Sequence, residues 1–164
     1  MNKAIKIIFL ILFSTKNLLS LEMVCNFEEV YQNGDIQQGH LLIKENKIRY
    51  QYNDNNLYTI LRTQGDFYLI ENIYPDKFMK IDQNTEALIG IEMIINDYPK
   101  LKSEYKINKV SIKPEMKFDD NFLKKITILS DQMNMNIYFP ECYQTSIQDR
   151  YFFYSPFFSF KKND

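Results

Sequence analysis

The clearest pattern in the chain is a period-two alternation of apolar and polar residues that ends at Tyr52. Such an alternation is typical of a β-strand with one buried face and one solvent-exposed face. The apolar positions are Ile48, Tyr50 and Tyr52, and the polar positions between them are Lys47, Arg49 and Gln51. We therefore expect a strand over residues 46–52 with a wet face and an apolar face.

Further segments around this strand have the length and spacing of an antiparallel meander. Turn-forming residues separate them, for example Gln64-Gly65, which tolerate or favour a positive φ. The predicted strands are residues 36–44, 57–63, 66–71, 77–82, 105–113 and 122–130, together with a strand that follows residue 132 and includes Phe139. Residues 21–31 fit either a short helix or a first strand, and residues 150–160 fit an edge or irregular strand because Pro156 interrupts them.

One segment has a helical period instead. Its apolar residues recur three, four and seven positions apart, and Asn84 or Thr85 can cap its start. Pro99 ends it, because the residue before a proline is disfavoured in the α region. The apolar positions are Ala87, Ile91, Ile94, Ile95 and Tyr98. The fold class is thus mainly β (α+β), with a helix apolar enough to cover one face of a sheet.

The first twenty residues have the plan of a secretory signal peptide. Lys3 and Lys6 precede an apolar run over residues 7–13 that is too short to span a bilayer, and cleavage is expected near Ser20. A lipid-modification site at Cys25 and an uncleaved anchor are the alternatives. Residues 21–164 then form a single exported domain of ordinary size.

The sequence contains two cysteines, Cys25 and Cys142. In an exported chain an even count favours one disulfide, and the alternative is a pair of buried free thiols. No C-x-x-C motif is present, so a thiol–disulfide catalyst is not indicated.

No catalytic constellation is visible in the sequence. His40 is the only histidine, and no metal-binding or nucleophile motif is present, so neither an enzymatic activity nor a cofactor is expected. Glu28 and Glu29 are adjacent and would face opposite sides of a strand. The net charge of −1 and the lack of a basic cluster give no reason to expect nucleic acid as a partner.

The chain is rich in tyrosine and phenylalanine, which favours strands. Methionine suits surfaces that accept variable apolar partners, so several methionines are candidates for lining a cavity for acyl chains. The alternative is that they fill an ordinary core. The candidates are Met79, Met93, Met133 and Met135.

The order and spacing of these segments resemble the periplasmic carriers that take lipoproteins to the outer membrane, the LolA-type chaperones. The resemblance covers residues 27–158 and involves a glycine-initiated strand, a basic and aromatic strand, and a strand pair joined at a glycine turn. The matching stretches are Gly39-His40-Leu41-Leu42-Ile43-Lys44, Lys47-Ile48-Arg49-Tyr50-Gln51-Tyr52, residues 57–63, Gln64-Gly65-Asp66 and Phe67-Tyr68-Leu69-Ile70. Departures are Glu45-Asn46 in place of the usual Arg-Pro, Tyr50 in place of a tryptophan, and no assignable counterpart of the arginine that holds the family's lid shut.

The resemblance implies an unclosed half-barrel whose concave apolar face is covered by helix and binds the acyl chains of a lipoprotein or lipid. It implies no enzymatic activity, a monomer, and two further partners, a transporter at the inner membrane and a receptor at the outer membrane. The residues expected to line the acyl cavity are Ile48, Tyr50, Tyr52, Ile91, Ile94, Met133, Met135, Ile137 and Phe139. A sensor or interaction module built on the same half-barrel is the alternative, and an enzyme is the third class.

Overall fold

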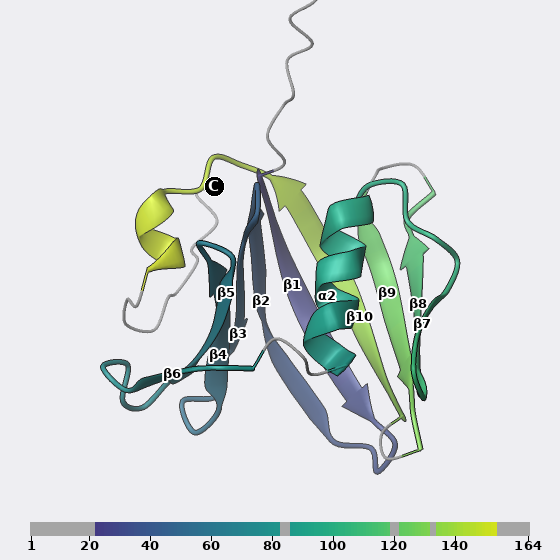
Figure 1. The fold of residues 1–164 in the computed structure, drawn as a ribbon, viewed down its shortest axis with the longest axis horizontal. Coiled ribbons are helices and arrows are strands. Elements are labelled where there is room, and N and C mark those ends of the chain that lie inside the picture. Colours follow the sequence, from purple (N-terminus) through teal and green to yellow (C-terminus); the bar gives the residue numbers. More distant parts are fainter. Residues whose placement is uncertain (1–21, 83–85, 119–121, 132–133, 154–164) are drawn as a thin grey trace, which may run out of the picture.

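The computed structural model describes residues 22–82, 86–118, 122–131 and 134–153. In this part of the chain a single antiparallel sheet has the strand order β6-β5-β4-β3-β2-β1-β10-β9-β8-β7. The strands are β1 (Glu22–Tyr31), β2 (Ile36–Lys44), β3 (Lys47–Tyr52), β4 (Tyr58–Thr63), β5 (Asp66–Glu71), β6 (Phe78–Lys80), β7 (Tyr105–Ile107), β8 (Val110–Met116), β9 (Leu123–Leu129) and β10 (Asn134–Gln144). The edge strands β6 and β7 do not pair, so the sheet is unclosed, and the predicted half-barrel fold class is confirmed (Figure 1).

The helix α2 (Glu86–Asp97) connects the two edges of this sheet. It lies across one face of the sheet in front of β9 and β10 (Figure 1), and its Ile94 joins a cluster that contains residues of both strands. The predicted covering helix is therefore confirmed, whereas its predicted caps, Asn84 and Thr85, lie outside the described residues.

Residues 22–31 form a strand, which decides between the two alternatives for this segment. Most predicted strands differ from the observed ones by one or two residues at an end, but one predicted strand is wrong. Residues 105–113 are not one strand, because a two-residue turn at Asn108-Lys109 divides them into β7 and β8. Asn108 has a φ of 50°, a conformation that asparagine tolerates better than most residues, and this permits the tight reversal.

The centre of the sheet joins the first and last strands. Cys25 and Cys142 are opposite each other in the pairing of β1 with β10, and a disulfide connects them. This confirms the predicted bond and excludes the pair of free thiols. Structural disulfides persist in oxidising compartments, so the chain belongs to a non-cytoplasmic compartment of that kind. Residues 1–20, the predicted signal peptide, lie outside the described residues.

The face of the sheet opposite α2 carries a second apolar cluster, which the C-terminal part of the chain covers. The short 3₁₀ helix η1 (Asp149–Phe152) lies on the other side of β3–β5 from α2 (Figure 1). It takes the place of the strand expected from residue 150 onward, and Pro156 lies outside the described residues. The cluster consists of Val24, Leu42, Leu61, Ile70, Ile147 and Phe152.

This second cluster corrects the prediction of a wet face on β3. Arg49 and Gln51 are buried, with exposed fractions of 1% and 0%. The Arg49 guanidinium donates to the Gln51 side chain at 2.7 Å and to the Tyr151 carbonyl at 3.1 Å. Burial lowers the pKa of Arg49 to about 10, so this side chain is charged at neutral pH. Its charge is buried away from water and is stabilised by hydrogen bonds to those acceptors.

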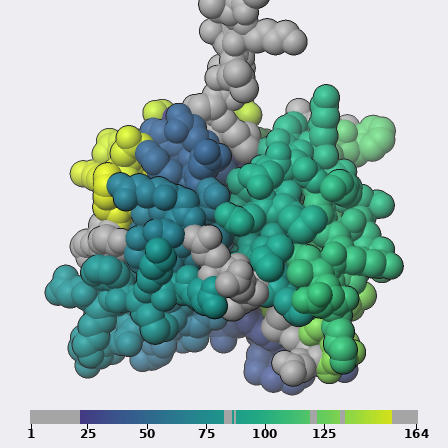
Figure 2. All heavy atoms as spheres, viewed as in Figure 1, coloured from purple at the N-terminus to yellow at the C-terminus, as the bar shows by residue number. Residues whose placement is uncertain are grey.

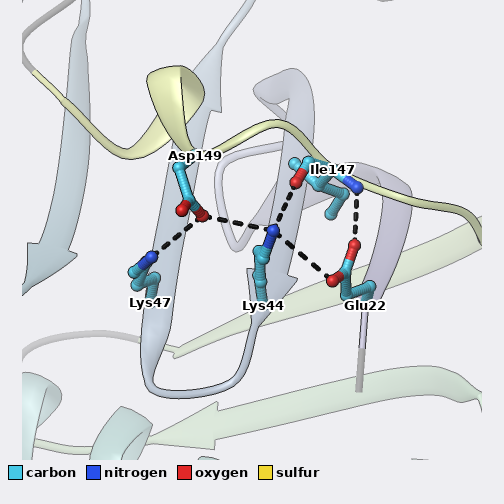
Figure 3. Close-up of polar contacts among 5 residues, drawn as sticks. All are labelled: Glu22, Lys44, Lys47, Ile147 and Asp149. Carbon is cyan, nitrogen blue, oxygen red and sulfur yellow. Dashed lines mark hydrogen bonds and ion pairs between the residues drawn. The ribbon is translucent and has the colours of Figure 1, made fainter. Parts of the chain in front are cut away.

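A polar clip fastens the C-terminal segment at the start of the sheet (Figure 3). Lys44 donates to the Ile147 carbonyl at 2.7 Å and forms ion pairs with Glu22 at 3.4 Å and Asp149 at 3.2 Å. The Ile147 amide donates to Glu22 at 2.6 Å, and Lys47 binds Asp149 at 2.9 Å. Ile147 is thereby held by both its amide and its carbonyl, directly beside its place in the second cluster.

The clip is expected to open in acid. The hydrogen bond from the Ile147 amide lowers the pKa of Glu22 below 4.5, and the hydrogen bond from Lys47 lowers that of Asp149 below 3.8. Because the folded-state pKa values are depressed, the stabilisation is complete above these ordinary values and is lost as the pH falls through the lowered ones. We expect the Ile147 amide resonance in a ¹⁵N NMR titration to change only below about pH 4.5.

A pair of variants checks this assignment. Asp149→Asn removes one carboxylate of the clip, so it should alter the transition, whereas Asp131→Asn, in an exposed pair with Lys109, should not. An Ile147 resonance that is unchanged well below both pKa values would contradict the prediction.

Candidate functional site

The apolar face beneath α2 is the candidate site. Its cluster of buried residues draws on β1–β3 and β7–β10 of the sheet and on Ile94 of α2. In the space-filling view, the side chains of α2 and of the β7–β8 hairpin cover the right-hand part of this face, while β4–β6 form the left-hand part (Figure 2). Cross-strand register builds the cluster, since residues opposite each other on one face share it, as Met23 and Ile43 do.

The structure gathers the residues predicted to line the acyl cavity into this one cluster. Five of them are buried in it, namely Ile48, Tyr52, Ile94, Ile137 and Phe139. Three are partly buried and pack against it, namely Tyr50, Ile91 and Met135. Met133 lies outside the described residues. Their common location follows from β-strand alternation and helical periodicity, whereas acyl binding by these residues stays a prediction.

Two contacts of different kinds attach α2 to the sheet. At Gly90 the helix approaches the β7–β8 hairpin so closely that a Cβ would overlap the Ile112 side chain. At the far side, Arg62 of β4 forms an ion pair with Glu92 of α2, with 2.9 Å between Nη2 and Oε1. Arg62 also donates to the Asn46 carbonyl in the β2–β3 turn. The helix therefore packs closely against one edge of the half-barrel and forms an ion pair with a strand nearer the other edge.

A carboxylate is buried in the same face. Glu29, with an exposed fraction of 2%, accepts hydrogen bonds from three tyrosine hydroxyls. Tyr31 and Tyr50 donate to it at 2.6 Å and Tyr52 at 2.8 Å. No lysine or arginine among the described residues lies within ion-pair distance of Glu29, so these three hydroxyls are what replace water around its charge.

The three tyrosines are held in the protonated form, in which each hydroxyl donates a hydrogen bond. Burial, reinforced by the neighbouring Glu29 carboxylate, raises the pKa values of Tyr31, Tyr50 and Tyr52 above the ordinary value of 10. All three hydroxyls are protonated at physiological pH, and their protons point at Glu29. The three hydroxyls therefore supply the hydrogen bonds that this carboxylate needs inside the apolar face.

Sequence reasoning did not identify Glu29 as part of the site. The sequence did contain an indication that Glu29 lies on the apolar face. The odd-numbered residues around it are apolar or aromatic, namely Met23, Cys25, Phe27 and Tyr31. That signal has meaning only once residues 22–31 are known to form a strand. The alternation predicted that Glu28 faces the opposite side of the strand from Glu29. Glu28 accepts a hydrogen bond from Gln38 on that side.

Two further observations limit the chemistry. The described residues contain no group of three or more histidine, cysteine, aspartate or glutamate side chains arranged to hold a metal ion. Among the same residues, no helix has the length and apolar character needed to cross a membrane.

Comparison with known proteins gives information about the fold. No protein-family model matches the chain. A search of curated proteins also finds no match. Among solved structures, the chain is similar to an uncharacterized conserved protein from Thermus thermophilus, with a TM-score of 0.53 and 8% sequence identity over 82% of this chain and 85% of that one. At this identity the similarity concerns the unclosed sheet and its helix, not a function.

Proposed function

We propose that this chain is an exported periplasmic carrier that binds the acyl chains of lipoproteins or lipids on the apolar face beneath α2 and helps move them to the outer membrane. The order of its elements, which resembles the LolA-type chaperones, supports this proposal. The observation that carries it is the position of α2 over an apolar face of an unclosed sheet, with close packing at one edge and an ion pair toward the other.

Binding in this mechanism exchanges one apolar contact for another. An acyl chain inserts between α2 and the sheet and takes over contacts now made by side chains such as Ile91 and Met135. Each methylene group removed from water contributes about 0.8 kcal/mol. A partly exposed ion pair such as Arg62–Glu92 contributes about 1 kcal/mol at most, so burial of a few methylenes exceeds the cost of opening that side.

The partners follow from the mechanism. A ligand held by burial leaves only when something else covers the same apolar groups. We therefore propose a transporter at the inner membrane as the source of the acylated protein and a receptor at the outer membrane that competes for it. The signal peptide over residues 1–20 would bring the chain to the compartment that its disulfide indicates.

The test is native mass spectrometry with lipid extraction on protein purified from the periplasm, followed by uptake of an acylated peptide in vitro. Wild type is expected to carry or take up acyl groups. Ile91→Asp and Met135→Asp place a charge at partly buried positions of the cluster and should weaken uptake at least tenfold, since burying an unpaired carboxylate costs several kcal/mol.

The matched control is Ile36→Asp, the same substitution at an exposed position of β2. It should bind like wild type, and circular dichroism should show the same strand content in all variants. Protein that is free of lipid and takes up no acylated peptide, or Asp variants that bind as wild type does, would refute the carrier function.

A second candidate function has its own supporting observation. The β5–β6 hairpin exposes four large apolar side chains, Ile73, Tyr74, Phe78 and Met79. β6 is also an edge strand, and exposed apolar edges are typical of interaction surfaces. This favours a sensor or interaction module that binds an envelope protein. The same purification discriminates the two, because a module would co-purify with a protein that has no acyl group.

A further inference from the structure

A hollow opens at the end of the sheet where β1 runs into β2 and β3 runs into β4. Its volume is about 210 Å³, and the residues that line it are Tyr31, Asn33, Asp35, Gln37, Tyr52, Leu57 and Tyr58. Cavities for drug-sized ligands are larger, from about 300 Å³ upward. The hollow therefore suits a small chemical group rather than an extended molecule.

The hollow is negatively charged. Asp35 lines it, and the buried Glu29 accepts hydrogen bonds from Tyr31 and Tyr52, two of its three tyrosines. Within the part of the chain that the structure describes, the lining contains no lysine, arginine or histidine. Asp35 accepts a hydrogen bond from the Asn33 side chain at 2.6 Å, and no basic side chain of the described residues pairs with it. Two carboxylates without a basic partner thus lie at or next to one small hollow.

The aromatic rings add the second element of recognition. Tyr52 and Tyr58 meet edge to face, with ring centroids 5.2 Å apart. The face of a tyrosine ring attracts a cation, above all when water is partly excluded. Hydrogen bonds to Glu29 fix Tyr31 and Tyr52, so these rings are already oriented before a ligand arrives.

From these features we propose that the hollow binds the ammonium group of a small organic cation. The exposed ring of Tyr58 contacts its alkyl or methyl groups, Asp35 supplies the opposing charge, and the buried Glu29 adds negative potential from behind Tyr31 and Tyr52. An anion is disfavoured by the same two carboxylates, and a neutral group gains nothing from them. The group can belong to a free amine or to a lipid headgroup, and the site does not depend on whether acyl chains bind beneath α2.

The first experiment is a ¹⁵N NMR titration of the full chain with choline and with tetramethylammonium. Shifts are expected at residues 31–37 and 52–58, with saturation. The control ligand is 3,3-dimethylbutan-1-ol, which has the shape of choline without its charge and should bind much more weakly. A separate titration with short-chain phosphatidylcholine below its micelle concentration distinguishes a free amine from a lipid headgroup as the ligand. Shifts at residues 31–37 and 52–58 with this lipid would show that a headgroup is accepted as well.

The variants test the two elements separately. Asp35→Asn keeps the size of the side chain and removes its charge, and Tyr58→Leu removes a ring that is partly exposed in the structure. Each should weaken choline binding about fivefold, the effect of one cation–ring or charge contact at a partly exposed site. Asp131→Asn and Tyr74→Leu make the same changes at exposed positions outside the hollow and should bind as wild type does.

The result that overturns the proposal is equally definite. Binding of the neutral alcohol as tightly as choline would mean an apolar hollow only, and unchanged binding by both Asp35→Asn and Tyr58→Leu would place the cation elsewhere. No shift at residues 31–37 and 52–58 with either cation would exclude the site. Uptake of acylated peptide by Asp35→Asn is expected to equal wild type. Failure of the cation site therefore leaves the carrier function standing, and failure of the carrier function leaves the cation site standing.

Discussion

Replacing both Cys25 and Cys142 with alanine is expected to lower the free energy of unfolding by about 4–5 kcal/mol. The bond joins residues 117 positions apart, and in the chain-entropy model the stabilisation grows with the logarithm of the loop that the bond closes. In that model the bond acts by restricting the unfolded chain, so the loss applies to unfolding of the whole domain. Urea unfolding followed by circular dichroism measures it.

The reduced wild-type protein separates the two contributions to this effect. Cys25 is completely buried, so alanine also leaves a small void, whereas reduction removes only the bond. Reduced wild type should therefore unfold at a slightly higher urea concentration than the alanine variant, and both well below the oxidised protein. Equal midpoints for oxidised and reduced protein would contradict the argument.

Replacing Phe27 with alanine is expected to cost about 3–5 kcal/mol, the range for loss of a fully buried aromatic ring. Phe27 stacks on Tyr50 with ring centroids 4.0 Å apart and meets Tyr52 edge to face at 5.5 Å. It also covers Gly39, its partner on β2, where a Cβ would overlap the Phe27 ring. An aromatic ring that covers a strand glycine compensates for the missing side chain, so alanine at position 27 would uncover this part of the sheet.

The control for this prediction is Phe118→Ala. Phe118 is fully exposed, and its removal should change stability by about 0.5 kcal/mol or less. Thermal and urea unfolding of the two variants give the comparison. Equal losses would show that the Phe27 ring contributes no more than an exposed phenylalanine does.

Local patterns were sufficient for much of the fold. β2 and β5 begin and end where alternation and turn residues predicted, because a period of two and residues such as Gln64-Gly65 act within a few positions of each other. Asn108 has the same capacity for positive φ, but its turn lies within a run that reads as one strand. A two-residue turn without glycine or proline gives too weak a signal to divide such a run.

The remaining differences depend on contacts between distant parts of the chain. Arg49 is buried because a segment about 100 positions further along the chain covers β3. Nothing in residues 46–52 themselves predicts that this segment packs there. The site shows the same limit. Alternation places Glu29 with the apolar side chains of β1, but only the register of β1, β2 and β3 brings the hydroxyls of Tyr50 and Tyr52 to it.

The disulfide and the strand order together impose a sequence of events on folding. β2 to β6 pair with neighbours in the chain, so these hairpins can form before the C-terminal strands have paired. β1, by contrast, acquires its second neighbour only when residues 134–144 are available. Until then one side of β1 is an unpaired edge with free amide and carbonyl groups, able to pair with another chain. Among the described residues, the last strand in the sequence is thus the one that closes the middle of the sheet, and the unfolded chain is most exposed to aggregation before this strand pairs with β1.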